Sequence, residues 1–273
     1  MTAVATTTAG AGKGPVRRFL DAYGPAILIL PLGLVVWEGA VRVFDIKGFL
    51  LPKPSDIALA YETEGAFISG AAWVTLQEAV GGFVVGASMG FLIALATARW
   101  KAVQEGALPL AIAVNSAPIV ALAPIFNAWF GSTNPLSKMA VVSVMVFFPV
   151  MINMTRGLRL VDPNELELMR SYAASDRAIL RKVRLPNALP FLFTGLKIGA
   201  VLSLIGAIVA EYFGGPVKAL GVYILQQSAG TRLAEAWAGI IIGTLMGIAF
   251  YLVIVIAERL AMPWHVTVRE TRR

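Results

Sequence analysis

The chain has 273 residues, of which 58% are hydrophobic and only 14% are charged, and its formal net charge is +7. A soluble domain is roughly 45–50% apolar and about 25% charged, so this composition excludes an ordinary water-soluble fold and favours a membrane protein. Basic residues that flank membrane spans account for the positive charge, so nucleic-acid binding is not expected. Cysteine is absent and the one histidine is His265, which excludes thiol chemistry and a histidine metal cluster within the chain.

Six stretches are apolar enough and long enough to cross a bilayer, because one crossing takes about 20 apolar residues in a helix. They are 24–44, 71–98, 105–130, 136–156, 190–212 and 236–259. The third contains Pro109, Pro118 and Pro124, and a membrane tolerates such breaks only where protein or a water-filled cavity satisfies the freed backbone groups. We therefore predict an all-α, polytopic membrane bundle of about six transmembrane helices, with the third span bent and buried.

The ends of the chain and its connections complete the predicted organisation. Residues 1–20 are predicted to form a disordered tail, 21–262 the transmembrane domain with a cytoplasmic loop at 157–189, and 263–273 a second tail. The segment 45–70 is expected as an outer loop, and Leu220–Gln227 as a short helix on the membrane surface. Most Lys and Arg residues fall on one set of connections, so the positive-inside rule predicts a multi-pass protein of the plasma (inner) membrane with both termini cytoplasmic.

The cytoplasmic segment 157–189 contains local signals of two helices. Asp162 followed by Pro163 is typical of an N-cap and a first helical position, which predicts a short helix over 164–172. Ser175 or Asp176 is expected to cap a second helix that runs to about Leu185, where Pro186 and Pro190 end it. An amphipathic helix–turn–helix is therefore predicted, and composition alone is equally compatible with a surface helix pair that merely joins two spans.

The same segment resembles the conserved cytoplasmic loop of permeases of ATP-binding cassette (ABC) importers. That loop has the pattern Glu-Ala-Ala, three residues, Gly, nine residues, then Ile-x-Leu-Pro, and the chain keeps its spacing with Glu167 first, Ala173 at the glycine position and Leu185–Pro186 at the end. If the turn needs a positive φ, alanine there costs about 1 kcal/mol or more. The alternatives are another turn geometry or a turn shifted to Ala174–Ser175.

Motifs outside the loop resemble the nitrate/sulfonate/taurine-type permeases, the binding-protein-dependent inner membrane components. They are Phe147–Phe148–Pro149, Gly195–Leu196–Lys197, Ala123–Pro124 and Trp129–Phe130–Gly131, and the resemblance covers about residues 50–260. It implies the type I ABC importer permease fold and a transport subunit that is not an enzyme and has no cofactor of its own, because ATP and Mg²⁺ belong to a separate ATPase. The implied partners are a second permease copy in a homodimer, two ATPase subunits, an extracytoplasmic solute-binding protein and membrane lipid.

The resemblance also implies which residues couple the chain to the ATPase. The loop helix would enter a cleft on the ATPase and offer both polar and apolar side chains, followed by the turn. The implied coupling residues are Glu165, Leu166, Glu167, Met169, Arg170, Tyr172, Ala173, Ala174 and Ser175.

Polar residues within spans are costly, so they are expected to face the bundle interior. There they line a solute path or form hydrogen bonds between helices. The candidates for the path are Asn115, Ser116, Asn127, Asn153 and Glu211, and Glu78 and Ser203 are further polar residues of the same kind. A catalytic site is not expected, because no His, Cys or Asp lies within a span to pair with either glutamate.

The solute implied by the resemblance is a pyrimidine-type vitamin precursor or a nitrate-, sulfonate- or taurine-like anion. The runs Lys182–Pro186 and Phe193–Lys197 are slightly more similar to the pyrimidine-precursor branch. The alternative function is that of a secondary transporter or channel working without an ATPase. Such proteins usually contain an internal repeat or paired charges at mid-membrane, and neither is evident in the sequence.

Overall fold

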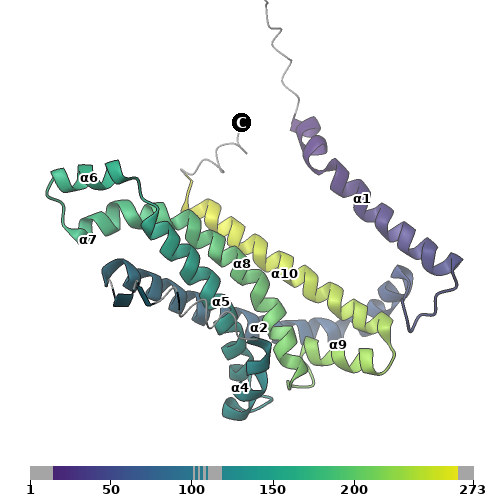
Figure 1. Cartoon of the computed structure of the whole chain (residues 1–273). Helices are drawn as coiled ribbons and strands as arrows, with labels where there is room; N and C mark the ends of the chain where they lie inside the picture. The colour runs from purple at the N-terminus through teal and green to yellow at the C-terminus, as the bar shows by residue number, and fades with distance from the viewer. Residues whose placement is uncertain (1–14, 101, 104, 107–108, 110–118, 264–273) are drawn as a thin grey trace, which may run out of the picture.

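The computed structural model describes residues 15–100, 102–103, 105–106, 109 and 119–263, and throughout these ranges the regular structure is helical (Figure 1), as predicted. Two early helices, α1 (Pro15–Val43) and α2 (Pro54–Arg99), precede the 3₁₀ turn η1 (Ile119–Leu122). The rest are α4 (Ala123–Phe130), α5 (Pro135–Arg159), α6 (Pro163–Ser171), α7 (Asp176–Ile179), the π-helical turn η2 (Leu180–Arg184), α8 (Leu185–Tyr212), α9 (Leu220–Ala229) and α10 (Leu233–Ala261).

Four helical segments within the described residues are long and apolar enough to cross a membrane: Pro54–Arg99, Pro135–Arg159, Asp176–Tyr212 and Leu233–Ala261. They contain the second, fourth, fifth and sixth predicted spans. Helix α1 covers the first predicted span, although it is not among the four, and it begins inside the predicted tail 1–20. Residues 107–108 and 110–118 of the third predicted span and most of the tail 263–273 lie outside the described residues, so the count of six spans stays a prediction.

Helix α2 begins 17 residues earlier than the predicted second span, because Pro54 starts it within the expected outer loop 45–70. This added part is amphipathic, with Ile57, Ala60 and Ile68 buried against α9 and α10 and with Glu62 exposed. A helix of this kind has too few consecutive apolar residues to be recognised as a span. The expectation that a connecting loop runs to residue 70 is therefore wrong from Pro54 onward.

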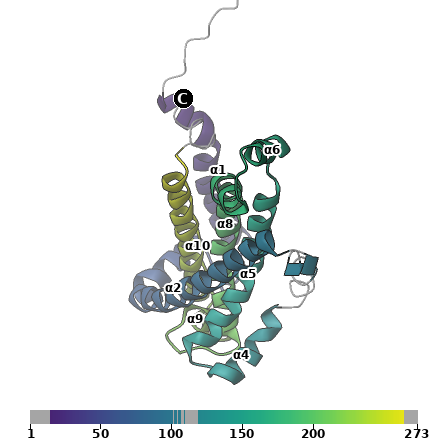
Figure 2. The same ribbon diagram turned by 90° about the vertical axis from the view of Figure 1, so that its left-hand side faces the viewer.

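The centre of the bundle is the packing of α2 on α5 and of α5 on α8 (Figure 2). Along α2, Gly82, Gly86 and Gly90 recur every four residues and press on the backbone of α5. A Cβ at Gly86 would overlap the Ser143 carbonyl, and one at Gly90 would lie 2.7 Å from the Phe147 carbonyl oxygen. Small residues at this spacing let membrane helices approach closely, so the pair is held by backbone contact.

Pro186 and Pro190, which follow the loop predicted to be cytoplasmic, do not end the second helix, contrary to the expectation from sequence. Asp176–Tyr212 is one helical segment, and the Leu185 N–H bonds to the Leu180 carbonyl five residues back. A proline ring crowds the carbonyl four residues before it, and the wider π turn η2 just before Pro186 accommodates this. The hairpin of the loop therefore continues into the membrane span without a break.

Helix α1 stands beside the bundle rather than inside it (Figure 1). Its contacts include the edge-to-face pair of Trp37 with Trp237, whose ring centroids are 5.2 Å apart. Glu38 accepts hydrogen bonds from the Ser55 N–H at 3.0 Å and the Ser55 hydroxyl at 2.8 Å. Lys53 offers no side-chain cap to α2, so Glu38 supplies the missing acceptor at that helix start.

Candidate functional site

The loop predicted to couple the chain to an ATPase is a helical hairpin that projects from one end of the bundle (Figure 1). It consists of α6, the turn 172–175, and the α7–η2 helix. Asp162 caps α6, because its side chain accepts a hydrogen bond from the Asn164 N–H at 2.8 Å. Ser175 caps α7, with the Ala178 N–H donating to its hydroxyl at 3.3 Å. Both predicted ends of the first helix and the predicted start of the second are confirmed to within one residue.

Ala173 adopts the left-handed conformation that the family pattern assigns to glycine, with φ of +49°. Its N–H donates to the Arg170 carbonyl at 2.9 Å, and the Ala174 N–H donates to the Met169 carbonyl at 3.0 Å. These two bonds are those of a Schellman motif, which closes a helix C-terminus. Alanine therefore occupies the same turn as the glycine, and neither alternative geometry is used.

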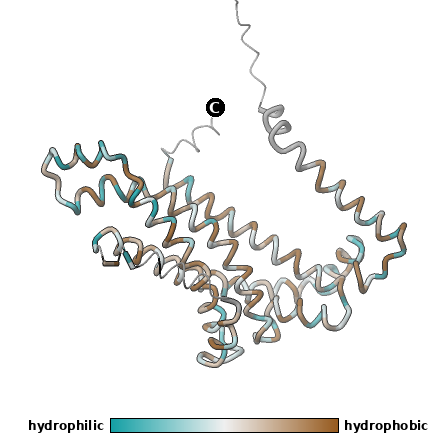
Figure 3. The backbone as a smooth tube through the Cα atoms, viewed as in Figure 1, coloured by the Kyte–Doolittle hydropathy of each residue, from teal (hydrophilic) through white to brown (hydrophobic). Residues whose placement is uncertain are grey.

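Helix α6 buries none of its residues in the bundle. The most exposed large apolar side chains here are Leu168 of α6, which is 57% exposed, and Tyr172 at its C-cap, which is 75% exposed. Leu166 and Met169 are half-buried within the hairpin. Figure 3 shows mixed polar and apolar residues on this hairpin and a mostly apolar bundle behind it. An exposed apolar tip in a charged surface is a feature of protein interaction sites.

The base of the hairpin is held by Asn187, a residue that the sequence analysis did not identify. Its side-chain N–H group donates to the Gly157 carbonyl at 2.9 Å and the Leu160 carbonyl at 2.8 Å. Beneath this contact a Cβ at Gly157 would lie 2.8 Å from the Ala188 Cα. Asn187 thus ties the end of α5 to the start of α8, and fixes how the hairpin leaves the membrane helices.

A buried polar network lies at the other end of the same helices. Glu211 accepts a hydrogen bond from the Thr75 hydroxyl at 2.7 Å and from the Gly221 N–H at 2.5 Å, and the Leu220 N–H donates to the Thr75 hydroxyl at 2.9 Å. Helix α9 has no side-chain cap of its own at Ala219. Thr75 and Glu211 together therefore cap α9 from two other helices.

Two further charged groups complete this network. Glu78 is 1% exposed and Lys138 is fully buried. The Lys138 ammonium donates to the Ser137 hydroxyl at 3.0 Å and to the Ser132 carbonyl, and it interacts electrostatically with Glu78 and Glu211. Neither Glu78 oxygen has a hydrogen-bond partner with acceptable geometry among the described residues. A single buried cation beside two buried carboxyl groups balances the charge of one of them.

The residues that the sequence predicts to line a solute path do not all belong to this network. Asn127 belongs to the network, since its side chain donates to the Phe213 carbonyl at 3.1 Å and accepts from Lys138 at 3.3 Å. Asn153 lies elsewhere on α5 and donates to the Pro149 carbonyl of its own helix at 2.8 Å. Asn115 and Ser116 lie outside the described residues. The roles of these residues stay predictions.

A second polar cluster links α2, α9 and the start of α10 near the surface. The Tyr223 hydroxyl and the Arg232 guanidinium each donate to Glu64 at 2.6 Å, and Arg232 also pairs with Glu235 at 2.8 Å. Burial raises the pKa of the Tyr223 hydroxyl, and the hydrogen bond to the Glu64 carboxylate raises this pKa further. These contacts fix α9 against the part of α2 that the sequence analysis treated as a loop.

Residues 82–264 match the family described as the binding-protein-dependent transport system inner membrane component. The chain belongs to this family. The match contains the hairpin, most of the buried network and three complete membrane helices, so the family pattern and the geometry concern the same segments.

Relatives of this permease cover nearly its whole length. The formylaminopyrimidine transport permease protein ThiX of Halalkalibacterium halodurans is 30% identical over 92% of the chain and 99% of its own length. The riboflavin transport system permease protein RibX of Chloroflexus aurantiacus is 29% identical over 86% of the chain and 88% of its own. The taurine transport system permease protein TauC of Escherichia coli is 25% identical over 85% of the chain and 86% of its own.

A solved structure of an amino acid ABC transporter resembles the permease with a TM-score of 0.58 and 21% sequence identity. The similarity covers 72% of the chain and 95% of that chain. At this identity it supports the fold, which is that of an ABC transporter permease. The predicted family and fold class are confirmed.

Proposed function

We propose that this chain is the membrane-spanning subunit of an ATP-driven importer and forms the translocation path for a small solute that a solute-binding protein delivers. A second copy of the chain and two ATPase subunits complete the assembly, and the ATPase subunits bind ATP and Mg²⁺. The observation that carries the proposal is the projecting hairpin, which is capped at both helix starts, exposes an apolar tip and continues into a membrane helix.

The proposed contact with the ATPase centres on the exposed face of α6. Leu168 and Tyr172 are four residues apart, so they lie on one face of the helix, and both are more exposed than Leu166 and Met169. Glu165 and Glu167 are exposed beside them and supply polar contacts. Closure of the ATPase dimer would move this face, and α7, η2 and α8 would carry the motion into the membrane.

Among the solutes open to this family, we favour a pyrimidine-type vitamin precursor over an anion. An anion path needs uncompensated positive charge within the membrane helices. Lys197 is instead paired with Glu258 at 2.9 Å, and Lys138 lies beside Glu78 and Glu211. Lys138 and Lys197 are the two lysines in the apolar regions of the four described spans. The positive charge of each is therefore offset by neighbouring acidic residues. Of the three relatives described above, the one that covers the largest share of the chain, 92%, is a transport protein for a formylaminopyrimidine, which agrees with this choice.

The proposed orientation places the hairpin and both termini in the cytoplasm. Basic residues concentrate at the hairpin end of the bundle, as the positive-inside rule requires. Helix α9 and the polar cluster around Arg232 then face the outside, where a solute-binding protein would arrive. Cysteines placed singly in this cysteine-free chain, at Ser171 and at Ser228, can be labelled from one side of sealed vesicles. With the reagent added outside the vesicles, labelling at position 171 only after permeabilisation supports the orientation. Labelling at position 228 only after permeabilisation contradicts it.

Uptake by proteoliposomes tests the function. The chain is reconstituted with the ATPase and the solute-binding protein whose genes neighbour its own, and uptake of radiolabelled formylaminopyrimidine and of taurine is measured with and without ATP. The variant Tyr172→Glu should lose ATP-driven uptake by about tenfold or more, because it places a charge in the proposed buried contact. Arg181→Glu, which changes an exposed residue of η2, is the control and should retain uptake.

The outcomes separate the parts of the proposal. ATP-dependent uptake of taurine alone would overturn the choice of solute and leave the importer function. Uptake that is equal with and without the ATPase would overturn the importer function and favour a secondary transporter. Unchanged uptake by Tyr172→Glu and Glu167→Arg would overturn the assignment of α6 as the coupling helix.

A further inference from the structure

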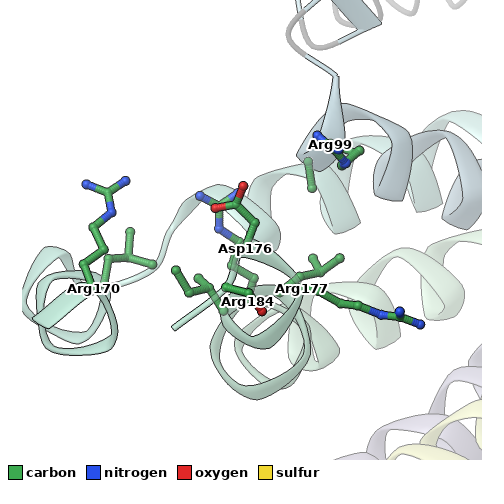
Figure 4. A pocket seen from close by; sticks show the side chains of 10 residues that line it. Arg99, Arg170, Asp176, Arg177 and Arg184 are labelled. Carbon is green, nitrogen blue, oxygen red and sulfur yellow. The ribbon is translucent and has the colours of Figure 1, made fainter. Parts of the chain in front are cut away.

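The charged residues at the hairpin end of the bundle need no ligand to explain them. A cavity of about 530 Å³ there has the charged lining Arg99, Arg170, Arg177, Arg184 and Asp176. Figure 4 shows the Arg170 and Arg177 side chains pointing away from each other, and both are exposed. The positive-inside rule accounts for basic residues at this end. It does not account for the charged groups of the buried network around Glu211, which lies at the other end of the same helices.

The buried network contains one basic and two acidic side chains. They are Lys138 of α5, Glu78 of α2 and Glu211 of α8, and each is at most 1% exposed. If both carboxyl groups were ionised, the three side chains together would carry one excess negative charge. An uncompensated charge is costly to bury, so a buried carboxyl group takes up a proton instead. The hydrogen bonds of the network indicate which carboxyl group does so.

The Lys138 side chain is satisfied as an ammonium ion. It donates to the Ser137 hydroxyl at 3.0 Å, to the Asn127 side-chain oxygen at 3.3 Å and to the Ser132 carbonyl. An ammonium group has three donors and no acceptor, so these three oxygens match it. Lys138 is therefore the cation of the network, and it interacts electrostatically with both carboxyl groups.

Glu211 has the surroundings of an ionised carboxylate. One of its oxygens accepts a hydrogen bond from the Thr75 hydroxyl at 2.7 Å, and the other accepts from the Gly221 N–H at 2.5 Å. Position 221 has no room for a side chain, because a Cβ there would lie 2.6 Å from the second oxygen. Two donors and a nearby ammonium group stabilise the charged form. The single negative charge of the network therefore belongs to Glu211.

Glu78 has the opposite surroundings. Among the described residues no group donates a hydrogen bond to either of its oxygens. An ionised carboxylate only accepts hydrogen bonds, whereas a protonated carboxyl group also has an O–H donor. Glu78 and Glu211 lie within hydrogen-bonding reach of each other, and two carboxyl groups form a hydrogen bond only if one of them carries a proton. The group without donors is the one that carries it.

We propose that Glu78 and Glu211 form a proton-binding site, in which Glu78 carries the proton and donates it in a hydrogen bond to Glu211. Glu78 is then neutral, and Lys138 and Glu211 balance each other. The bond gives Glu211 a third donor and holds its carboxylate where it caps α9. Glu78 is thus a positioning residue that acts on α9 through Glu211. Without the proton, two carboxylates would face one ammonium group, and their repulsion would weaken the cap.

A metal ion is the alternative occupant of this site. The Lys138 ammonium group lies beside both carboxyl groups, and it would repel a second cation in the same space. A proton instead forms the hydrogen bond that Glu78 lacks. Tyr212, a further titratable group that interacts with Glu211, is a phenol and adds no charge at neutral pH. The proposal is independent of the transported solute and of the ATPase.

The first test is infrared spectroscopy of the full chain in lipid nanodiscs at neutral pH. A neutral carboxylic acid has a C=O stretching band that is separate from the bands of a carboxylate, and isotope-labelled glutamate assigns the band to a glutamic acid. The wild type should show this band, and Glu78→Gln should lose it. Glu258→Gln is the matched control, because Glu258 forms an ion pair with Lys197, and this variant should keep the band.

Amide hydrogen exchange then measures the effect of the proton on α9. Glutamine has the shape of a protonated glutamic acid, is uncharged and can donate a hydrogen bond. Glu78→Gln should therefore leave the exchange of the Leu220 and Gly221 N–H groups within about twofold of the wild type. Glu78→Leu is also uncharged but has no donor, so both groups should exchange about tenfold faster, as expected when a hydrogen bond to a charged group is lost.

Four results would overturn the proposal. A wild type without the band has no such proton, and thermal stabilisation by Na⁺ that Glu78→Gln abolishes would then assign the site to a metal ion. A band that persists in Glu78→Gln would place the proton on another residue. Equal exchange rates in Glu78→Gln and Glu78→Leu would show that the donor has no effect on α9. Failure of Glu78→Gln to fold would contradict a neutral Glu78. Failure of transport in the uptake assay would leave all of these readouts unaffected.

Discussion

Ala173→Gly tests whether the turn of the hairpin stores strain. The left-handed conformation costs a non-glycine residue roughly 1–2 kcal/mol, and Ala173 holds φ of +49°. Glycine removes this cost but loses roughly 0.5–1 kcal/mol through the greater freedom of the unfolded chain. We therefore expect a net stabilisation of the folded hairpin of about 0.5–1 kcal/mol, which is about a two- to fivefold change in its opening equilibrium.

Amide hydrogen exchange measures this opening directly. The N–H groups of residues 173 and 174 donate the two bonds that close α6, so both should exchange about two- to fivefold more slowly in Ala173→Gly. Ala174→Gly is the matched control, because Ala174 is not among the residues with positive φ and glycine there only adds freedom to the unfolded chain. It should exchange faster than the wild type. Faster exchange in Ala173→Gly as well would refute the reasoning.

Three further substitutions test other contacts, each by thermal unfolding in detergent. Gly86→Ala should destabilise the chain by about 1–3 kcal/mol, because the added Cβ would overlap the Ser143 carbonyl. The control Gly70→Ala should be neutral or slightly stabilising, because nothing lies within 4 Å of its added Cβ. Equal effects of the two substitutions would contradict the close approach of α2 and α5. Thr231→Gly should stabilise by about 1 kcal/mol, because Thr231 has φ of +60°, and a lower melting temperature would argue against that turn. Lys138→Met should destabilise by roughly 3–5 kcal/mol since it removes the cation beside two buried carboxyl groups, while loss of the exposed Lys47 should have little effect.

The boundaries of the hairpin are predictable from the sequence because their signals are local. Asp162 caps a backbone N–H two residues later, and Ser175 caps one three residues later. Such contacts depend on short-range geometry that residue type controls. The membrane helices are predictable for a related reason, since length and hydropathy are properties of one segment.

The remote caps are not predictable in this way. Glu38 caps a helix start 17 residues away, and Thr75 accepts a hydrogen bond from the N–H of Leu220, 145 residues away. Neither α2 nor α9 has a side-chain cap in its own sequence. Sequence patterns identify only caps close in the chain, so the early start of α2 and the buried network around Glu211 require the tertiary structure.

The turn after α9 shows the same limit on a smaller scale. Gly230 is the residue that sequence rules assign to a left-handed helix end. In the structure the following residue, Thr231, takes that conformation, and the Arg232 N–H closes α9 by donating to the Gln227 carbonyl at 2.9 Å. Arg232 is held in place by its pairs with Glu64 and Glu235. Contacts outside the turn therefore decide which residue adopts the strained conformation.

Continuity of α7, η2 and α8 connects the hairpin to the buried network. The segment Asp176–Tyr212 has 37 residues, which at a rise of 1.5 Å per residue is about 55 Å of helix. The hairpin turn lies at one end, and Glu211, whose carboxylate holds the start of α9, lies at the other. A break at Pro186 would let the hairpin move alone. Because η2 absorbs the proline instead, we expect a tilt of the hairpin to carry Glu211, and through it α9, at the other end of this helical segment.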